Sequence, residues 1–347
     1  MVKGLSVPTT LDAALDPAWL AYALRDLGCG KRVTEVDTVE IIRTMATKVR
    51  FTVRFDDSDE VHAFCLKGFL DVGDAASQGG ATTVLEADFY DKIAPKVGVR
   101  VPECVVAIVD RDAPLGVIIM RDLIAQGARF CTALEAFTAD EAAESLKQIA
   151  ALHAGRGLLE TSPWITPRVG QLARMQHITP AMLQEMLDGP RGVGLSPQIT
   201  NASRLIEGLK ALADKDAKRD QFLVHGDSHA GNIFRTADGL GLIDWQLLQR
   251  GGWALDVAYH INAVLPVNVA ASEERRLLTG YLADMRIRGF AMPNDDDAWE
   301  QYREAAIYGF YLWSITRRVE PEVINLFVNR LGSAVTRLES YGLLEIA

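Results

Sequence analysis

Three side chains in the second half of the sequence have the types and the spacing that phosphoryl transfer requires. The amide of Asn232 follows Asp227 by five positions, and Asp244 comes after two short apolar runs. Transfer of the γ-phosphoryl group of magnesium-ATP depends mainly on positioning and on neutralising negative charge. Magnesium prefers oxygen ligands, so Asn232 and Asp244 are the predicted metal ligands. Asp227 suits a different task, which is to orient an acceptor hydroxyl and accept its proton.

The surroundings of these residues match a kinase catalytic loop. The spacing from Asp227 to Asn232 fits the H-x-D-x-x-x-x-N pattern, and Asp244 falls where kinases carry the D-F-G aspartate. Short strands are predicted at 222–224, 233–235 and 241–243, with a turn at 238–239. A His-Gly-Asp tripeptide alone is more often a structural turn, but here spacing, strands and the second aspartate agree. The sequence therefore predicts a catalytic loop over 225–232.

At these residues the chain resembles the aminoglycoside phosphotransferase and choline kinase superfamily. The runs Ile243-Asp244-Trp245-Gln246 and Asp256-Val257-Ala258-Tyr259 are most similar to its ecdysteroid-kinase-like branch and the bacterial relatives of that branch. The resemblance implies that Asp256 is structural and braces the catalytic loop, and that His225 orients the loop backbone. His229 is a candidate substrate contact, although a loop histidine is more often simply a polar surface residue.

The resemblance implies an α+β, protein-kinase-like fold with two lobes. A small N-terminal lobe over 1–123 would hold an antiparallel sheet and one helix, with a hinge near 119–123. A larger, mainly helical C-terminal lobe would cover 124–347. The length of 347 residues and a hydrophobic content of 49% fit two lobes. A protein kinase is disfavoured because Gly252 and Asp256 follow Asp244 without an activation loop of the usual length.

The N-terminal part of the chain contains a predicted strand pair with a lysine near its end. Residues 48–56 alternate basic and apolar side chains, which is the two-residue period of a half-buried strand. Residues 61–69 predict the returning strand, and this strand carries Lys67. The long, flexible ammonium of Lys67 can reach the α- and β-phosphate oxygens of a nucleotide.

A helix is predicted after this strand pair. Gln78-Gly79-Gly80 predicts a loop, and 82–94 has an apolar stripe at helical spacing. The run Glu86-Ala87-Asp88-Phe89-Tyr90 resembles the glutamate-containing helix motif of the superfamily. Glu86 is therefore the implied partner of Lys67, and both are expected to take part in catalysis.

A second strand pair, at 101–109 and 114–120, leads into the expected hinge. The resemblance implies that backbone groups near Met120 and Arg121 meet the adenine edge, while Ile118, Met120 and Ile243 supply apolar walls. ATP is the expected nucleotide, with GTP as an alternative.

The phosphates would have to be held without a glycine-rich loop, because residues 38–54 contain no glycine. Thr44 and Thr47 of the segment 43–47 are the substitutes we predict, through hydroxyls and backbone N–H groups. The missing glycines are the one feature that favours an alternative function, a nucleotide-binding regulator with little transfer activity.

The acceptor is predicted to be a small molecule with a hydroxyl group. Aromatic residues are frequent after the catalytic loop, and the run 308–311 resembles a helix that borders the acceptor pocket in the ecdysteroid-kinase-like branch. Trp253, Tyr308 and Tyr311, with His229, are the candidate contacts. They favour an apolar or aromatic alcohol, whereas an aminoglycoside or a choline-like cation is the alternative. A position in the core would equally explain most of these aromatic residues.

The C-terminal lobe is predicted to be mainly helical. Thr138 and Glu141 have capping-box spacing ahead of an amphipathic helix that ends near His153. Further helices are predicted at 180–188, 197–213, 272–288, 295–317 and 321–340.

Composition narrows the class of protein further. A net charge of −10 and a pI near 5.2 argue against nucleic-acid binding, which requires a basic face. The sequence has no run of eighteen apolar residues and no signal peptide, so we expect a cytoplasmic protein without a membrane partner. The four cysteines lack metal-binding spacing and predict reduced, mostly buried thiols; they are Cys29, Cys65, Cys104 and Cys131.

Overall fold

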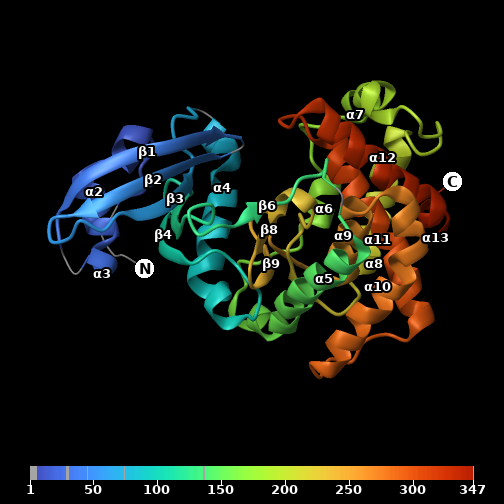
Figure 1. Ribbon diagram of the computed structural model, residues 1–347. Coiled ribbons are helices and arrows are strands. Elements are labelled where there is room, and N and C mark those ends of the chain that lie inside the picture. Colours follow the sequence, from blue (N-terminus) through green and yellow to red (C-terminus); the bar gives the residue numbers. More distant parts are fainter. Residues whose placement is uncertain (1–5, 29–30, 45, 74, 136, 347) are drawn as a thin grey trace. The chain divides into compact units, whose positions relative to one another are not determined.

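The computed structural model describes residues 6–28, 31–44, 46–73, 75–135 and 137–346. The chain divides into two compact units. The first unit comprises Met1–Lys96, Val101–Arg129 and Ile243–Gln246, and the second comprises Val97–Arg100, Phe130–Leu242 and Leu247–Ala347. We describe each unit by itself (Figure 1).

The first unit is built on an antiparallel five-stranded sheet. Its strand order is β1-β2-β3-β5-β4. The strands are β1 (Val33–Arg43), β2 (Thr47–Phe55), β3 (His62–Gly68), β4 (Cys104–Asp110) and β5 (Leu115–Arg121). The predicted strands at 48–56, 61–69, 101–109 and 114–120 are therefore confirmed to within a few residues.

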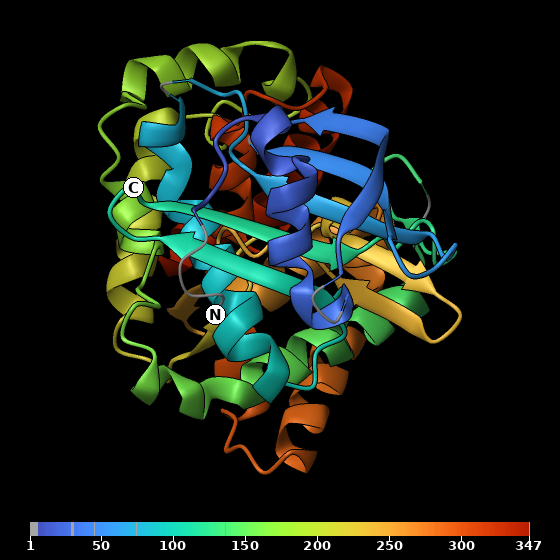
Figure 2. The ribbon, with the colours of Figure 1, turned by 90° about the vertical axis from the view of Figure 1, so that its left-hand side faces the viewer.

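Alternation along β2 gives the sheet two different faces. Val49, Phe51 and Val53 are buried, and they pack in one core with Leu20 and Leu24. Three short helices precede the sheet, and Figure 2 shows them in dark blue in front of it; the first two contribute side chains to this core. They are α1 (Leu11–Ala14), α2 (Pro17–Ala23) and α3 (Arg25–Gly28).

The opposite face carries Lys48 and Lys67 beside apolar side chains of β5, in rows across the strands. Lys48 of β2 pairs with Lys67 of β3, which pairs with Ile118 of β5. In the next row, Cys65 of β3 pairs with Met120 of β5. Because side chains alternate between faces, both rows lie on the face away from the buried residues of β2.

The helix after β3 begins earlier than the sequence predicts. Helix α4 (Ala75–Asp88) includes Gly79 and Gly80, so the predicted loop at 78–80 is wrong. A Cβ atom at Gly80 would lie 2.3 Å from the carbonyl oxygen of Pro114, and one at Gly116 would lie 2.3 Å from that of Thr83. These glycines permit close packing of α4 against the start of β5, and do not mark a turn. The helix continues into a π-helical turn at Phe89–Ile93 and a short 3-10 turn at Ala94–Lys96.

The second unit is mainly helical, as predicted. Its helices are α5 (Ala139–His153), α6 (Val169–Ala173), α7 (Pro180–Asp188), α8 (Ala202–Asp216), α9 (Ala254–Val264), α10 (Val267–Ile287), α11 (Asp295–Ile315), α12 (Pro321–Arg337) and α13 (Ser340–Leu343). Thr138 and Glu141 form the predicted capping box of α5. Helix α8 begins later than the predicted residue 197 because the side chain of Asn201 caps it. The predicted helix 321–340 is interrupted where Glu339 adopts a φ of +53°.

Short strands frame the loop that follows β7. Strand β7 (Phe222–Val224) pairs with β10 (Gln249–Gly251), and β8 (Ile233–Thr236) forms a hairpin with β9 (Gly239–Leu242). The turn of this hairpin places Gly239 at a φ of +115°, as the Asp-Gly pair predicts. A further short strand, β6 (Arg129–Phe130), precedes Cys131, whose N–H donates to the carbonyl oxygen of Ile233.

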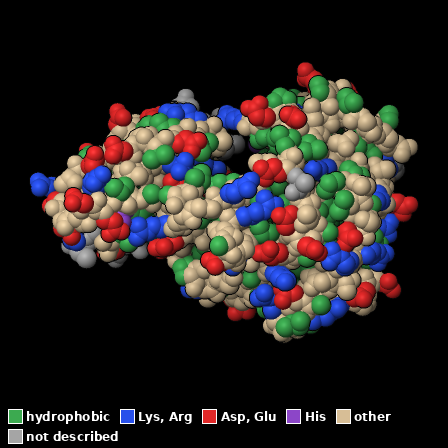
Figure 3. Space-filling view, in the orientation of Figure 1, with side chains coloured by type: hydrophobic (Ala, Val, Ile, Leu, Met, Phe, Trp, Pro, Cys, Tyr) green, Lys and Arg blue, Asp and Glu red, His purple; other side chains and the backbone are tan. Residues whose placement is uncertain are grey.

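Three observations concern the surface charges, the helices and the cysteines. Lysines and arginines are interspersed with acidic side chains over the face shown in Figure 3. In the described ranges, no helix is long and apolar enough to cross a membrane. Cys131 is buried, and Cys65 and Cys104 are half-buried, whereas Cys29 lies outside the described residues.

Candidate active site

Lys67 joins two carboxylates within the first unit. Its Nζ lies 2.8 Å from Oε2 of Glu86 and 2.9 Å from Oδ1 of Asp244. Lys48 Nζ is farther away, at 3.8 Å from Oδ2 of Asp244. We call Lys67, Glu86 and Asp244 the lysine cluster.

The lysine cluster is largely buried, and its charges depend on one another. Burial alone would lower the pKa of Lys67, but Asp244 and Glu86 raise it to about 12. Burial raises the pKa of the Glu86 carboxyl, and the Lys67 ammonium opposes that rise. The side chains of Lys67 and Glu86 are each only 4% exposed, whereas that of Asp244 is 20% exposed. Asp244 is therefore the member of the cluster that a ligand reaches most easily.

The turn at Asp244 is fixed to the end of helix α4. Asp244 has a φ of +67°, which is uncommon for a residue with a side chain. The next residue, Trp245, donates its backbone N–H to Oε1 of Glu86 at 3.2 Å. Its indole stacks on Phe89, with ring centroids 3.7 Å apart and planes 13° apart. These contacts place Asp244 beside Lys67 at the cost of a strained backbone.

The residues predicted to contact the nucleotide fall into two groups, the apolar side chains near Lys67 and the two threonines, whose hydroxyls already have hydrogen-bond partners. Ile118 and Met120 share a sheet face with Lys67, and Ile243 is half-buried beside Asp244 in the chain. Thr44 donates both its N–H and its hydroxyl to the carbonyl oxygen of Ala46. Thr47 is buried, and its hydroxyl donates to the carbonyl oxygen of Leu70 at 2.9 Å. The structure thus gives both threonine hydroxyls backbone partners, and Met45, between them, lies outside the described residues.

An arginine that the sequence did not single out crosses the same sheet face. Arg50 Nε donates to Oδ2 of Asp122 at 2.9 Å, and Nη1 donates to Oε2 of Glu40 at 2.9 Å. Asp122 follows β5 directly and is within the predicted hinge. The sequence signal was that Arg50 is the next basic residue after Lys48 in the alternating pattern of β2.

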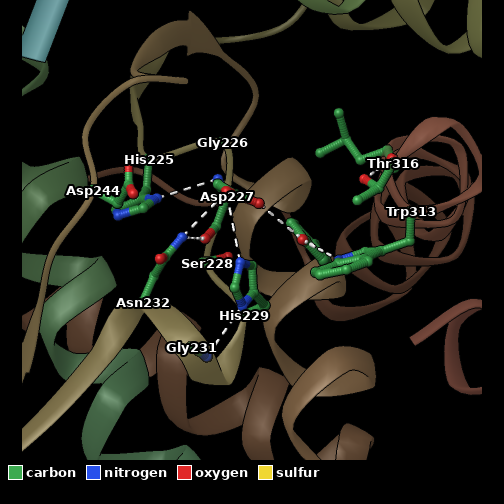
Figure 4. Close-up of polar contacts among 12 residues, drawn as sticks. His225, Gly226, Asp227, Ser228, His229, Gly231, Asn232, Asp244, Trp313 and Thr316 are labelled. Carbon is green, nitrogen blue, oxygen red and sulfur yellow. Dashed lines mark hydrogen bonds and ion pairs between the residues drawn. The ribbon is translucent and has the colours of Figure 1, made fainter. Parts of the chain in front are cut away.

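In the second unit, Asp227 is held by two side-chain donors (Figure 4). The Tyr259 hydroxyl donates to Oδ1 at 3.0 Å, and Asn232 Nδ2 donates to Oδ2 at 3.2 Å. Asn232 Nδ2 also donates to the backbone oxygen of Asp227 at 2.8 Å. The Trp313 indole N–H donates in turn to the Tyr259 oxygen at 2.7 Å. We call Asp227, Asn232, Tyr259 and Trp313 the loop cluster. The sequence analysis did not identify Tyr259 or Trp313 as partners of Asp227.

Asp256 holds the backbone at the start of the predicted catalytic loop, 225–232. Its carboxylate accepts the N–H groups of His225 at 2.7 Å and Gly226 at 2.9 Å, and lies 3.1 Å from Nε2 of His153. Burial would raise the pKa of Asp256, but His153 and the backbone donors hold it below its ordinary value. Gly226, with a φ of +81°, makes this turn possible. His225 Nδ1 accepts the N–H of Asp227 at 3.1 Å.

A buried histidine fixes the next residue of the loop. His260 Nδ1 lies 2.7 Å from the carbonyl oxygen of Ser228, and its Nε2 lies 2.6 Å from Oγ of Ser145. Burial lowers the pKa of His260 to about 4, so the ring is neutral at pH 7. Its Nδ1–H therefore donates to Ser228, and its Nε2 accepts from Ser145. The sequence missed this contact because it joins residues far apart in the chain.

His229 faces both Asp227 and Trp313. Its Nδ1 accepts the N–H of Gly231 at 3.0 Å, so the ring hydrogen is on Nε2. Nε2 lies 3.6 Å from Oδ2 of Asp227, which is beyond hydrogen-bond length. The ring meets Trp313 edge-on, with centroids 5.2 Å apart. His229 remains a candidate contact for an acceptor, since its side chain is 15% exposed.

The other three aromatic acceptor candidates lie in the core. Trp253 is 2% exposed and stacks on Tyr281 at 5.5 Å. Tyr308 is fully buried and donates its hydroxyl to the backbone oxygen of Gly226 at 2.8 Å. Tyr311 is 2% exposed, and its hydroxyl donates to the backbone of Leu172 at 3.0 Å. The structure uses most of the surface of these three side chains in packing, so their role as acceptor contacts stays a prediction.

Each unit, taken by itself, offers an oxygen donor of the kind that magnesium prefers. Within the described part of the chain, no group of three or more His, Cys, Asp or Glu side chains could hold a metal alone. Magnesium is typically bound by one or two protein oxygens plus substrate phosphates. Asp244 offers a carboxylate. Because Asn232 donates Nδ2 to Asp227, its Oδ1 is the atom left for a metal.

Comparison with known proteins places this geometry in a family context. Residues 80–294, more than half of the chain, match the sequence profile of APH, a phosphotransferase enzyme family. Among curated proteins, none matches the sequence significantly.

Solved structures with the same fold include two kinases. The structure of choline kinase LicA from Streptococcus pneumoniae is 14% identical, with a TM-score of 0.50, and the match covers 89% of this chain and 94% of that chain. A microcompartment-associated aminopropanol kinase is 15% identical, with a TM-score of 0.52, and the match covers 90% and 94% of the two chains. The expected α+β, kinase-like fold is thereby confirmed.

Proposed function

The chain belongs to the APH phosphotransferase enzyme family, and from this premise we propose that it transfers the γ-phosphoryl group of ATP to a hydroxyl of a small molecule. The observation that carries the proposal is Lys67, whose buried ammonium contacts both Glu86 and Asp244. A lysine held in this way can bind the α- and β-phosphate oxygens as a fixed positive charge.

The proposed roles divide between phosphate binding and proton transfer. Lys67 binds phosphate oxygens, and Glu86 holds the ammonium in place. Asp244 and Oδ1 of Asn232 are the proposed magnesium ligands. Magnesium, bound with the nucleotide, supplies positive charge to the phosphate oxygens. Ile118, Met120 and Ile243 are the proposed apolar neighbours of the adenine ring of ATP.

Asp227 is the proposed catalytic base. Its side chain is 27% exposed, so an acceptor hydroxyl can reach it. In the proposed step, the acceptor oxygen forms a bond to phosphorus while its proton passes to the Asp227 carboxylate. The bond from phosphorus to the β-phosphate oxygen breaks, and ADP leaves with that electron pair. His225 and Asp256 keep the loop in position and take no part in the chemistry.

The acceptor class is proposed from the aromatic residues that are frequent in the sequence after residue 232 and from the His229 ring beside Asp227, which is 15% exposed. Tyr259 and Trp313 are buried behind the carboxylate and do not support the choice of acceptor. We propose an apolar or aromatic alcohol. The alternative is an amino alcohol or another organic cation, as in the names of the two solved kinases.

An ATP-consumption screen tests this function. Purified protein would be offered magnesium-ATP with sterols, phenols, amino alcohols, choline, amino sugars and macrolides, and ADP release would be measured against an Asp227→Asn control. We expect one acceptor class to raise ADP release at least tenfold in the wild type and not in the variant.

Thermal shift separates this function from that of a nucleotide-binding regulator. Magnesium-ATP should raise the Tm, because a ligand stabilises the state that it binds. Stabilisation by ATP without ADP release for any acceptor would favour the regulator. No stabilisation and no turnover would contradict both proposals.

A further inference from the structure

A directed chain of hydrogen bonds ends on Asp227. It runs from the Trp313 indole N–H to the Tyr259 oxygen at 2.7 Å, and from the Tyr259 hydroxyl to Oδ1 of Asp227 at 3.0 Å (Figure 4). Its direction is fixed, because an indole N–H only donates and an ionised carboxylate only accepts. A hydroxyl that accepts a hydrogen bond also donates a stronger one.

The far end of the chain is anchored by packing. Trp313 of α11 stacks on Phe327 of α12, with centroids 4.1 Å apart and planes 28° apart. His229 packs edge-on against both rings, at 5.2 Å from Trp313 and 5.3 Å from Phe327. Tyr259 comes from α9 and meets Tyr308 edge-on at 6.1 Å. Three helices therefore determine where the Tyr259 hydroxyl points.

The Asp227 carboxylate is partly exposed, whereas the two side chains that support it are buried. The Asp227 side chain is 27% exposed, whereas Tyr259 is fully buried and Trp313 is 5% exposed. Burial, and next the Asp227 charge, raise the pKa of Tyr259 well above its ordinary value, so the phenol stays protonated as a donor. A substrate can thus touch Asp227 without touching Tyr259.

We propose that Tyr259 and Trp313 are positioning residues for phosphoryl transfer, which aim the Asp227 carboxylate at the acceptor hydroxyl. The inference rests on the proposed function of Asp227. Tyr259 holds Oδ1 and Asn232 holds Oδ2, so the two donors fix the plane of the carboxylate. Loss of the Tyr259 hydroxyl lets that plane rotate, and misplacement of a catalytic group by about 1 Å can cost on the order of 100-fold in rate.

Kinetics of conservative variants test the proposal. The variants are Tyr259→Phe, Trp313→Phe and the double variant, and the control is Tyr341→Phe, a buried tyrosine whose hydroxyl donates to Ile199 O at 3.4 Å. The probe is magnesium-ATP with water as acceptor, followed by the best acceptor of the screen. We expect kcat to fall at least tenfold in Tyr259→Phe and less in Trp313→Phe, with the KM for ATP within twofold of wild type.

The double variant shows whether the two residues act through one chain. Because Trp313 reaches Asp227 only by way of Tyr259 in this chain, the double variant should have the kcat of Tyr259→Phe alone. Multiplied losses would mean that the residues act separately and would overturn the proposal. An unchanged kcat in Tyr259→Phe, measured beside an active wild type, would also overturn the proposal.

A spectroscopic measurement checks the chain without turnover. The protein has six tryptophans, so the indole N–H signal of Trp313 can be assigned in a ¹⁵N-labelled sample by its loss in Trp313→Phe. We expect Tyr259→Phe to shift that signal and speed its exchange with water, while Tyr341→Phe leaves it in place. An unmoved signal would overturn the proposal. A wild type that transfers phosphate neither to water nor to any acceptor would instead overturn the proposed function, and this inference with it.

Discussion

The lysine cluster and the loop cluster hold their carboxylates in opposite ways. In the lysine cluster, Asp244 and Glu86 share one buried ammonium, and Lys48 adds a second, more distant charge. In the loop cluster, Asp227 is held by a phenol and an amide, both neutral donors. The first arrangement depends on charge balance and the second on the direction of hydrogen bonds.

This difference suits the chemistry proposed for each cluster. A group that binds metal and phosphate must exchange charged partners when the nucleotide arrives, and an ion pair with a partly exposed carboxylate permits that exchange. A base must keep one orientation through the reaction, and neutral donors fix it without neutralising its charge. The comparison makes distinct predictions for the two clusters.

The largest expected effect on stability comes from removing the shared ammonium. Lys67→Met removes the ammonium that lies between Glu86 and Asp244 and leaves only the more distant Lys48 near Asp244, and breaking a buried pair in this way costs about 3–5 kcal/mol. Chemical denaturation without nucleotide would measure the loss. Lys48→Met is the matched control and should cost less than about 1 kcal/mol, because Lys48 is 27% exposed and its Nζ is 3.8 Å from Asp244. Equal losses in the two variants would contradict a cluster centred on Lys67.

The next effect concerns the neutral histidine beneath the loop. The pKa of His260 is about 4 in the folded chain and near 6.5 when unfolded, so the unfolded state binds more protons between these values. The free energy of unfolding should therefore fall as the pH drops from about 6.5 to 4, by roughly 3 kcal/mol from this residue.

The His260 prediction is measured as a difference between two proteins. Urea denaturation of wild type and His260→Gln at several pH values from 7 to 4 cancels the titration of other groups. The wild type should lose stability more steeply than the variant. Parallel curves would show that His260 does not bind Ser228 as a neutral ring.

A smaller effect separates the two functions proposed for Asn232. In Asn232→Asp the oxygen proposed to bind the metal is kept, but the donor to Asp227 is lost and a second carboxylate takes its place. We expect magnesium-ATP affinity to fall no more than threefold while kcat falls at least tenfold, because the lost hydrogen bond is worth roughly 1.4 kcal/mol and repulsion between the two carboxylates adds to that loss. Calorimetric titration and steady-state kinetics on one preparation would measure both. A loss of affinity with kcat intact would reverse the assignment.

Local patterns predicted much of the fold. Three features depend only on residues a few positions apart, so a short stretch of sequence is enough to predict them. They are the alternation in β2, the capping box of Thr138 and Glu141, and the turn at Gly239. Gly79 and Gly80 misled the helix prediction because they permit close contacts, that of Gly79 with the Phe69 ring and that of Gly80 with Pro114 before β5. Nothing adjacent in the chain reveals these contacts.

The candidate site divides in the same way. Asp227, Asn232 and Asp244 stand in one motif, and the sequence named them together. Tyr259 lies 32 residues from Asp227, and Trp313 lies 54 residues from Tyr259, so only the folded chain brings them into one hydrogen-bond chain. The sequence also could not show that Trp253, Tyr308 and Tyr311 are buried, because composition does not distinguish a tyrosine that supports a loop, such as Tyr308, from one that lines a pocket.

The most direct test of the account compares the two aspartates in one experiment. The dissociation constant of magnesium-ATP and the rate of phosphoryl transfer would be measured for Asp227→Asn and Asp244→Ala. We predict that Asp227→Asn loses about 10²–10⁴-fold in rate with nucleotide affinity unchanged, whereas Asp244→Ala loses magnesium-dependent affinity for ATP. Full turnover in Asp227→Asn, or equal loss of affinity in both variants, would contradict the assignment of one aspartate to the base and the other to the metal.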